Sequence, residues 1–140
     1  KKYLEKGQTP WTPAISIIFA LDVSLDMLLK QGMPAVIAKH TKVADAARNG
    51  VKSLGLSLFA DINHASNTVT SVCGPESLNI KEMRRILREE KDIVLGGGQQ
   101  TLDGKIFRIG HMGWVTEKEI AEVVKEIGLV LPRCGFSGIK

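Results

Sequence analysis

Residues 104–113 read Gly104-Lys105-Ile106-Phe107-Arg108-Ile109-Gly110-His111-Met112-Gly113. The apolar run between two glycine-containing turns predicts a β-strand over residues 105–110. A single arginine, Arg108, lies in the middle of this strand. The apolar residues of this strand predict part of the core. Because a buried guanidinium needs a partner, the presence of Arg108 among them needs an explanation.

Three further strands are predicted upstream of this one. Residues 56–59 and 68–73 are short and rich in alternating or β-branched side chains, as half-buried strands are. Residues 93–95 form a short apolar run that predicts a strand, and the Gly96-Gly97-Gly98 triplet after them predicts a flexible loop. The connections between adjacent strands are too short for parallel crossovers, which favours antiparallel pairing.

The first long helix is predicted to start at Thr12 and to stop at Gly32. Thr12 supplies a hydroxyl cap, and Pro13 occupies the first helical position. Apolar side chains fill nearly every face, so we expect this helix to be buried on most sides. Asp22 and Asp26 interrupt the apolar run, which falls short of the roughly 20 apolar residues of a membrane span.

Two helices follow, each with recognisable ends. The first begins at Pro34, closes at Gly55 and places Arg48 on its solvent side. The next begins after Asn79, which we expect to cap it, and runs to about Lys91.

The last helix has the clearest signal in the sequence. Thr116 and Glu119 are spaced as a capping box, and an apolar stripe follows them. After Gly128, residues 129–140 show no clear period and predict a loose tail.

The order of the elements is helix, helix, strand, strand, helix, strand, strand, helix. This order predicts an α/β protein of the α+β, two-layer kind, in which helices pack on a small, mostly antiparallel sheet. A chain of 140 residues has room for one globular domain with a core but no second full domain.

Composition argues against several classes of function. Nineteen basic and fifteen acidic residues give a net charge of +4, which is spread too evenly to indicate a nucleic-acid surface. Cys73 and Cys134 have no CxxC spacing and no two histidines are close, so we expect no disulfide, no metal site and a reducing cytoplasm. The chain shows no signal peptide and begins without an initiator Met, which suggests part of a longer protein.

Residues 7–13, Gly7-Gln8-Thr9-Pro10-Trp11-Thr12-Pro13, carry more polar groups than a scaffold needs. One amide, two hydroxyls and several backbone N–H groups precede a helix N-terminus, an arrangement suited to a phosphate. The alternative is that the prolines and threonines simply form a turn and a helix cap.

Arg108 is the candidate for binding a carboxylate. A guanidinium fork on a rigid strand can bind a carboxylate bidentately, and flanking glycines allow a ligand to approach; the alternative is an edge-strand arginine that reaches water. The triplet at residues 96–98 lacks the spacing of a nucleotide-binding motif. Arg84, Arg85 and Arg88 interleave with glutamates, which predicts a solvated helix face.

Three segments carry a resemblance to a known family. In chain order they are Lys6-Gly7-Gln8-Thr9-Pro10-Trp11-Thr12-Pro13-Ala14-Ile15-Ser16, Thr68-Val69-Thr70, and the segment 104–113 quoted above. Together they resemble the C-terminal part of class V pyridoxal-phosphate-dependent aminotransferases, in particular the alanine–glyoxylate and serine–glyoxylate (serine–pyruvate) aminotransferases. The resemblance runs from about Lys2 to Gly128.

The resemblance implies the small C-terminal domain of a fold type I pyridoxal-phosphate enzyme that acts as a homodimer, without metal or membrane. In that family a segment like residues 8–12 contacts the cofactor phosphate of the neighbouring subunit. This assigns cofactor binding to Gln8, Thr9 and Thr12. The strand arginine of the family binds the α-carboxylate of the substrate, which assigns substrate binding to Arg108.

The resemblance also implies a division of labour along the chain. Residues 1–12 would be an interdomain segment with the phosphate loop, residues 13–128 the small domain, and residues 129–140 a tail. The family's cofactor lysine lies upstream of these positions, so no catalytic residue is assigned and the fragment alone is expected to be inactive.

The implied reaction of the full-length protein is transfer of an amino group from alanine or serine to an oxo-acid such as glyoxylate or pyruvate. Some relatives in this family carry the label of a soluble hydrogenase subunit. The alternative from another class is a stand-alone αβ module that binds a small molecule or a nucleic acid.

Overall fold

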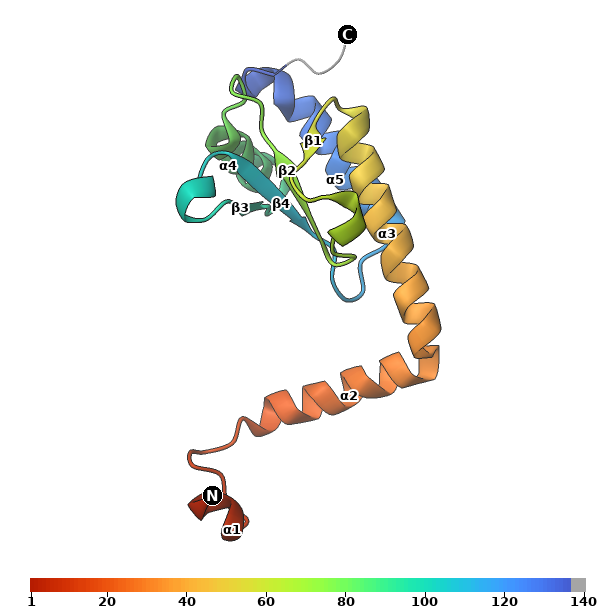
Figure 1. Cartoon of the computed structure of the whole chain (residues 1–140), viewed down its shortest axis with the longest axis vertical. Helices are drawn as coiled ribbons and strands as arrows, with labels where there is room; N and C mark the ends of the chain where they lie inside the picture. The colour runs from red at the N-terminus through yellow and green to blue at the C-terminus, as the bar shows by residue number, and fades with distance from the viewer. Residues whose placement is uncertain (137–140) are drawn as a thin grey trace. The chain divides into compact units, whose positions relative to one another are not determined.

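The computed structural model describes residues 1–136, which divide into a first compact unit, Lys1–Ile37, and a second unit that begins at Ala38 (Figure 1). The first unit contains α1 (Lys2–Glu5) and α2 (Ile15–Gln31). The following helix, α3 (Met33–Ser53), starts in the first unit and continues into the second.

The start of α2 differs from the prediction. The Ile15 N–H donates to the Pro13 carbonyl at 2.9 Å, and Ala14 has φ −77° and ψ 71°, which forms an inverse γ-turn before the helix. The N-cap is therefore Ala14, and the prediction that Thr12 caps the helix is wrong. The end is confirmed, because Gly32 follows the last turn with a φ of 84° that glycine adopts readily.

No residue of α2 is buried. Apart from Leu28, which is half-buried, its large apolar side chains are exposed, from 43% for Met27 to 70% for Leu29. The expectation of a buried helix is wrong for the described chain. The apolar pattern predicts a helix, but burial also needs a surface to pack against, which the pattern does not reveal. Within residues 1–136, no helix is long and apolar enough to cross a membrane.

The second unit is built on a four-stranded antiparallel sheet with the strand order β1-β2-β4-β3. The strands are β1 (Ser57–Leu58), β2 (Val69–Cys73), β3 (Gly96–Gly97) and β4 (Ile106–Gly110). Short 3₁₀ helices occur at Ile62–His64, Gln100–Leu102 and Leu131–Cys134. The predicted class, a two-layer α/β domain with a small antiparallel sheet, is confirmed.

The position of β3 corrects the prediction for this part of the chain. The apolar residues 93–95 are not a strand, because Asp92 ends the preceding helix in the left-handed region and the Ile93 N–H donates back to Leu87 O at 3.0 Å. The strand falls instead on the glycines that were expected to form a loop. Gly98 continues the pairing, since its N–H donates to Ile106 O at 3.1 Å.

Three helices cover one face of this sheet: α3, α4 (Ile80–Lys91) and α5 (Glu117–Val130) (Figure 1). Val72 of β2 and Phe107 and Ile109 of β4 point into the core between the layers. Burying these side chains against the helices provides the main favourable free energy of folding.

Local capping signals are confirmed where they were strongest. The Asn79 side chain accepts a hydrogen bond from the Glu82 N–H, and Thr116 and Glu119 form a complete capping box. Residues 129–136 are not a loose tail, because α5 reaches Val130 and both Leu131 and Cys134 are buried in the core. The remaining four residues of the expected tail, 137–140, lie outside the described residues.

Candidate functional site

Arg108 lies on the face of the sheet opposite the helices. In β4 it alternates with the buried Phe107 and Ile109, so its own side chain points the other way and is half-buried. Its neighbours in register are Ser71 on β2 and Gly96 on β3. Because β4 is an interior strand, the alternative of an edge-strand arginine does not hold.

The guanidinium of Arg108 is only partly satisfied by the protein. Its Nε donates to the Gly97 carbonyl at 3.0 Å. Among residues 1–136, its two terminal nitrogens make no hydrogen bond and no carboxylate forms an ion pair with it. A half-buried cation with free donors on a rigid strand is suited to bind a carboxylate.

Sequence reasoning missed the residues that hold the strand beside Arg108. Arg84 was expected on a solvated helix face, but it is partly buried and its Nε donates to the Leu95 carbonyl at 2.9 Å. This bond holds the chain just before Gly96 and Gly97. The glycine triplet was the available signal, because three glycines beside an arginine-bearing strand indicate a close approach of side chains to backbone.

Two buried polar residues, His111 and Thr70, are in contact at the C-terminal end of β4. The His111 ring is 1% exposed, and its Nε2 lies 2.9 Å from Thr70 Oγ1 on the neighbouring strand. Burial lowers the pKa of His111, and the nearby Arg48 adds to this effect. Residues 1–136 contain no group of three or more side chains arranged to hold a metal ion.

Arg48 corrects another expectation, since it was placed on the solvent side of its helix. Its side chain is buried, and it bonds Asp45 at 3.0 Å, the Ser66 carbonyl at 2.9 Å and Asn67 Oδ1 at 2.8 Å. It therefore fixes the loop that leads into β2. Its partners lie up to 19 residues away in sequence, so helical spacing alone could not identify it as buried.

The predicted phosphate segment lies in the first unit and is exposed. Gln8, Thr9 and Thr12 lie within one turn-rich stretch, in which the Thr9 hydroxyl donates to the Trp11 carbonyl at 2.6 Å. The backbone N–H groups of Thr9, Trp11 and Thr12 make no hydrogen bond within the described chain. These donors and the Gln8 amide are the chemical groups that bind a phosphate.

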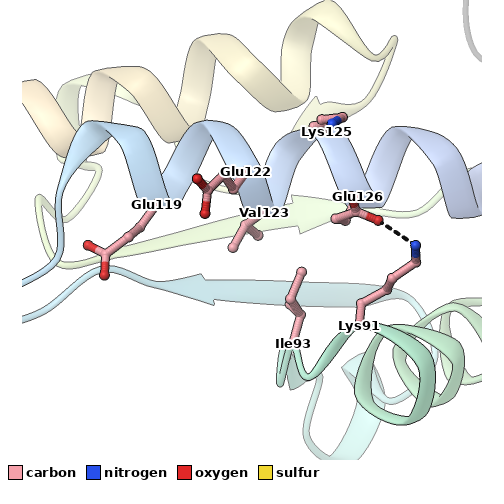
Figure 2. A pocket seen from close by; sticks show the side chains of 7 residues that line it. All are labelled: Lys91, Ile93, Glu119, Glu122, Val123, Lys125 and Glu126. Carbon is pink, nitrogen blue, oxygen red and sulfur yellow. Dashed lines mark ion pairs between the residues drawn. The ribbon is translucent and has the colours of Figure 1, made fainter.

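A groove of about 580 Å³ lies between α5 and the end of α4 (Figure 2). Glu119, Glu122 and Glu126 line one side, and Lys91 reaches across to Glu126 at 3.0 Å. None of the residues predicted to bind cofactor or substrate lines it. Because its charges are mixed and partly paired, the groove has no feature that selects an anionic substrate.

Several known proteins similar to this chain are named as aminotransferases. An uncharacterized aminotransferase of Methanocaldococcus jannaschii is 43% identical over 136 residues, covering 97% of this chain and 35% of that protein. A serine–glyoxylate aminotransferase of Arabidopsis thaliana is 31% identical over 128 residues, covering 91% and 32%. The small subunit of a soluble hydrogenase from Synechococcus is 35% identical over 137 residues, covering 98% and 35%. No family model matches the chain.

A solved structure supports the same relationship. Ureidoglycine–glyoxylate aminotransferase of Bacillus subtilis superposes with a TM-score of 0.88 at 27% identity, over 99% of this chain and 37% of that one. The similarity in sequence and in fold thus defines an aminotransferase domain. The chain belongs to the class V aminotransferases and matches their small C-terminal portion. It spans about a third of the length of the relatives it matches.

The buried His111 gives a prediction about pH. Its pKa is lowered in the folded protein, so below about pH 6.5 the unfolded chain binds the proton that the folded chain rejects. The free energy of unfolding should therefore fall as the pH drops below about 6.5. Above this pH the histidine is neutral in both states and does not destabilise the fold. The slope of the free energy of unfolding against pH gives the number of protons taken up on unfolding. His111→Gln should lower this number by at most about one, as measured by urea titrations between about pH 7 and pH 5.

The exposed His64 provides the matched control, because His64→Gln removes a histidine that the fold does not bury. An unchanged slope in His111→Gln, or an equal reduction in both variants, would contradict the prediction.

Proposed function

We propose that this chain is the small C-terminal domain of a pyridoxal-phosphate-dependent aminotransferase. In the full-length protein it would help transfer an amino group from alanine or serine to an oxo-acid such as glyoxylate or pyruvate. The observation that carries the proposal is Arg108, a half-buried cation on an interior strand with free donors and no acidic partner in the described chain. The name of a serine–glyoxylate aminotransferase among the relatives supports the substrate class.

Arg108 would bind the α-carboxylate of the amino acid. Bidentate binding fixes the direction of the carboxylate as well as its distance, which positions the amino group for reaction. A lysine at this position would keep the charge but lose the planar pair of donors. The proposed role therefore depends on the shape of the guanidinium as well as on its charge.

Gln8, Thr9 and Thr12 would bind the cofactor phosphate. Pyridoxal phosphate supplies an electron sink that stabilises negative charge developing on the substrate. The free N–H groups and the Gln8 amide fit the phosphate, and the Thr9 hydroxyl can join them once it leaves the Trp11 carbonyl. We place these groups across the interface of a homodimer, following the resemblance.

The exposed apolar surface of α2 supports a role within a larger assembly. Nine large apolar side chains of this helix are more than two-fifths exposed: Ile15, Ile17, Ile18, Phe19, Leu21, Val23, Leu25, Met27 and Leu29. An apolar surface of this kind usually marks an interface. We propose that the apolar surface of α2 packs against the rest of the full-length protein. In that protein, residues 1–12 would connect to the small domain at residues 13–128.

Other functions have less support. A nucleic-acid module of the sheet type would present aromatic side chains on its strands, but Phe107 is fully buried in the core. Two of the relatives are named as soluble hydrogenase subunits, and the free donors of Arg108 do not support a hydrogenase function.

The free thiols of Cys73 and Cys134 support a reducing cytoplasm as the compartment.

The chain on its own should have no transaminase activity, because the family's cofactor lysine lies upstream of the matching residues. Incubation with pyridoxal phosphate, reduction with borohydride and mass spectrometry should show only scattered labelling of surface lysines. A stoichiometric adduct at one lysine, or turnover of alanine with glyoxylate, would contradict the expectation.

Thr9→Ala in the full-length enzyme should weaken retention of the cofactor by about tenfold or more, since a hydrogen bond to a charged group contributes roughly 1.5 to 3 kcal/mol. Thr9→Ser keeps the hydroxyl and should restore retention. Thr101→Ala changes an exposed threonine of the second unit and serves as the control. Equal cofactor affinities for Thr9→Ala and the unmodified enzyme, measured by dialysis and absorbance, would remove Thr9 from the site.

Arg108→Lys tests the proposed function directly. In the full-length enzyme it should lower kcat/KM for alanine by roughly 10- to 100-fold, because the paired donors are lost. Ethylamine, which is alanine without its carboxylate, should react at nearly the same slow rate in both enzymes.

Arg88→Lys, on the exposed side of α4, is the matched control and should leave both amines unaffected. If Arg108→Lys slows both amines equally, or lowers the melting temperature while specific activity stays intact, Arg108 is a structural residue and the proposed role is wrong.

A further inference from the structure

We propose that the glycine strand β3 is a positioning element for Arg108, held in place by Arg84 from the other face of the sheet. Because Gly96 has no side chain, it leaves room for the side chain of Arg108. The Gly97 carbonyl accepts the hydrogen bond from Arg108 Nε. The two terminal nitrogens then remain for the substrate carboxylate. This inference rests on the proposed function, because it explains how the same arginine is aimed.

Gly96 lies directly opposite Arg108 in the register of β3 and β4. A Cβ atom at Gly96 would lie 3.3 Å from Arg108 Nε, 3.4 Å from its Cβ and 3.5 Å from its Nη2. The arginine side chain therefore runs along the space that any other residue at position 96 would fill. The first of these distances is tighter than ordinary contact, so even alanine would displace the guanidinium by a few tenths of an ångström.

The Gly97 carbonyl lies on the outer side of β3. In an antiparallel pair, residues alternate between hydrogen-bonded and non-hydrogen-bonded positions. The Gly98 N–H donates to Ile106 O, so Gly97, which pairs with Phe107, occupies a non-hydrogen-bonded position and directs its carbonyl away from β4. Arg108 Nε reaches this carbonyl only by crossing over β3 at Gly96.

This bond restricts how Arg108 can bind an anion. A guanidinium can pair with a carboxylate through Nε and one terminal nitrogen, or through both terminal nitrogens. Because the Gly97 carbonyl occupies Nε, the second mode remains. The backbone of β3 thus sets the direction from which a carboxylate can approach.

Arg84 holds the same strand from the face that carries the helices. Its Nε donates to the Leu95 carbonyl at 2.9 Å, and a Cβ at Gly97 would lie 2.5 Å from its Nη1. A Cβ at Gly98 would lie 1.9 Å from the Leu102 carbonyl oxygen, so the backbone leaves no room for a side chain at this position either. Two arginines therefore bond backbone carbonyls of one three-residue segment, Leu95–Gly97, from opposite faces.

The test uses the full-length enzyme with pyridoxal phosphate bound. Gly96→Ala should raise KM for alanine and lower kcat/KM by about tenfold, since a small misplacement of a positioning group is costly, while ethylamine should be unaffected. In the Arg108→Lys background, adding Gly96→Ala should change kcat/KM less than twofold, because its effect passes through Arg108.

Arg84→Met is the second variant, and it keeps the test decisive if Gly96→Ala folds poorly. It should shift the same ratio between alanine and ethylamine in the same direction, while Arg88→Met on the same helix should not. Melting temperatures of all variants separate a change in the site from a loss of folded protein.

The outcomes distinguish the inference from the proposed function. If Arg108→Lys separates alanine from ethylamine but Gly96→Ala and Arg84→Met change both amines equally or neither, the inference is overturned and the proposed function stands. If the effects of Gly96→Ala and Arg108→Lys on kcat/KM are fully additive, the inference is likewise overturned and the proposed function stands. If Arg108→Lys itself fails to separate the two amines, the role of Arg108 and this inference are both wrong.

Discussion

The second unit depends on the pairing of β4 with a strand on each side. Its register with β2 places Val72 beside Phe107 and Thr70 beside Ile109, which directs these side chains toward the helices. The same alternation sends Arg108 to the opposite face. A slip of one residue would bring a charged guanidinium into the core and expose two large apolar side chains. The burial of the core and the exposure of the arginine are therefore fixed by one constraint.

Arg48 is buried and Arg108 is half-buried, and the two arginines have different consequences because their partners differ. Arg48 bonds a carboxylate, a backbone carbonyl and an amide oxygen, so its charge and donors are satisfied within the protein. Arg108 has one backbone partner and keeps two nitrogens free within the described chain. The first arginine stabilises a loop, whereas the second retains its capacity to bind an anion. Counting the partners of each guanidinium separates a structural role from a binding role.

Local signals predicted this fold well where they act over one helical turn. Asn79 and Thr116 cap their helices as expected, because a cap depends on residues three positions away. Arg48 and β3 were misjudged because their partners lie 11 to 19 residues away or on another strand. For the site, the sequence predicted Arg108 from its strand and the family resemblance. It did not predict that Gly96 makes room for the guanidinium, since that needs the register of two strands.

The two edges of the sheet have a consequence for how molecules of this protein associate. β1 and β3 form these edges, and each is only two residues long. Short edge strands offer few unpaired backbone groups, so they are poor templates for adding a strand from another molecule. Addition of a strand to these edges is therefore disfavoured, whereas α2 exposes nine large apolar side chains. Contacts with other polypeptides are therefore expected to use side chains of α2 rather than backbone groups at the edges of the sheet.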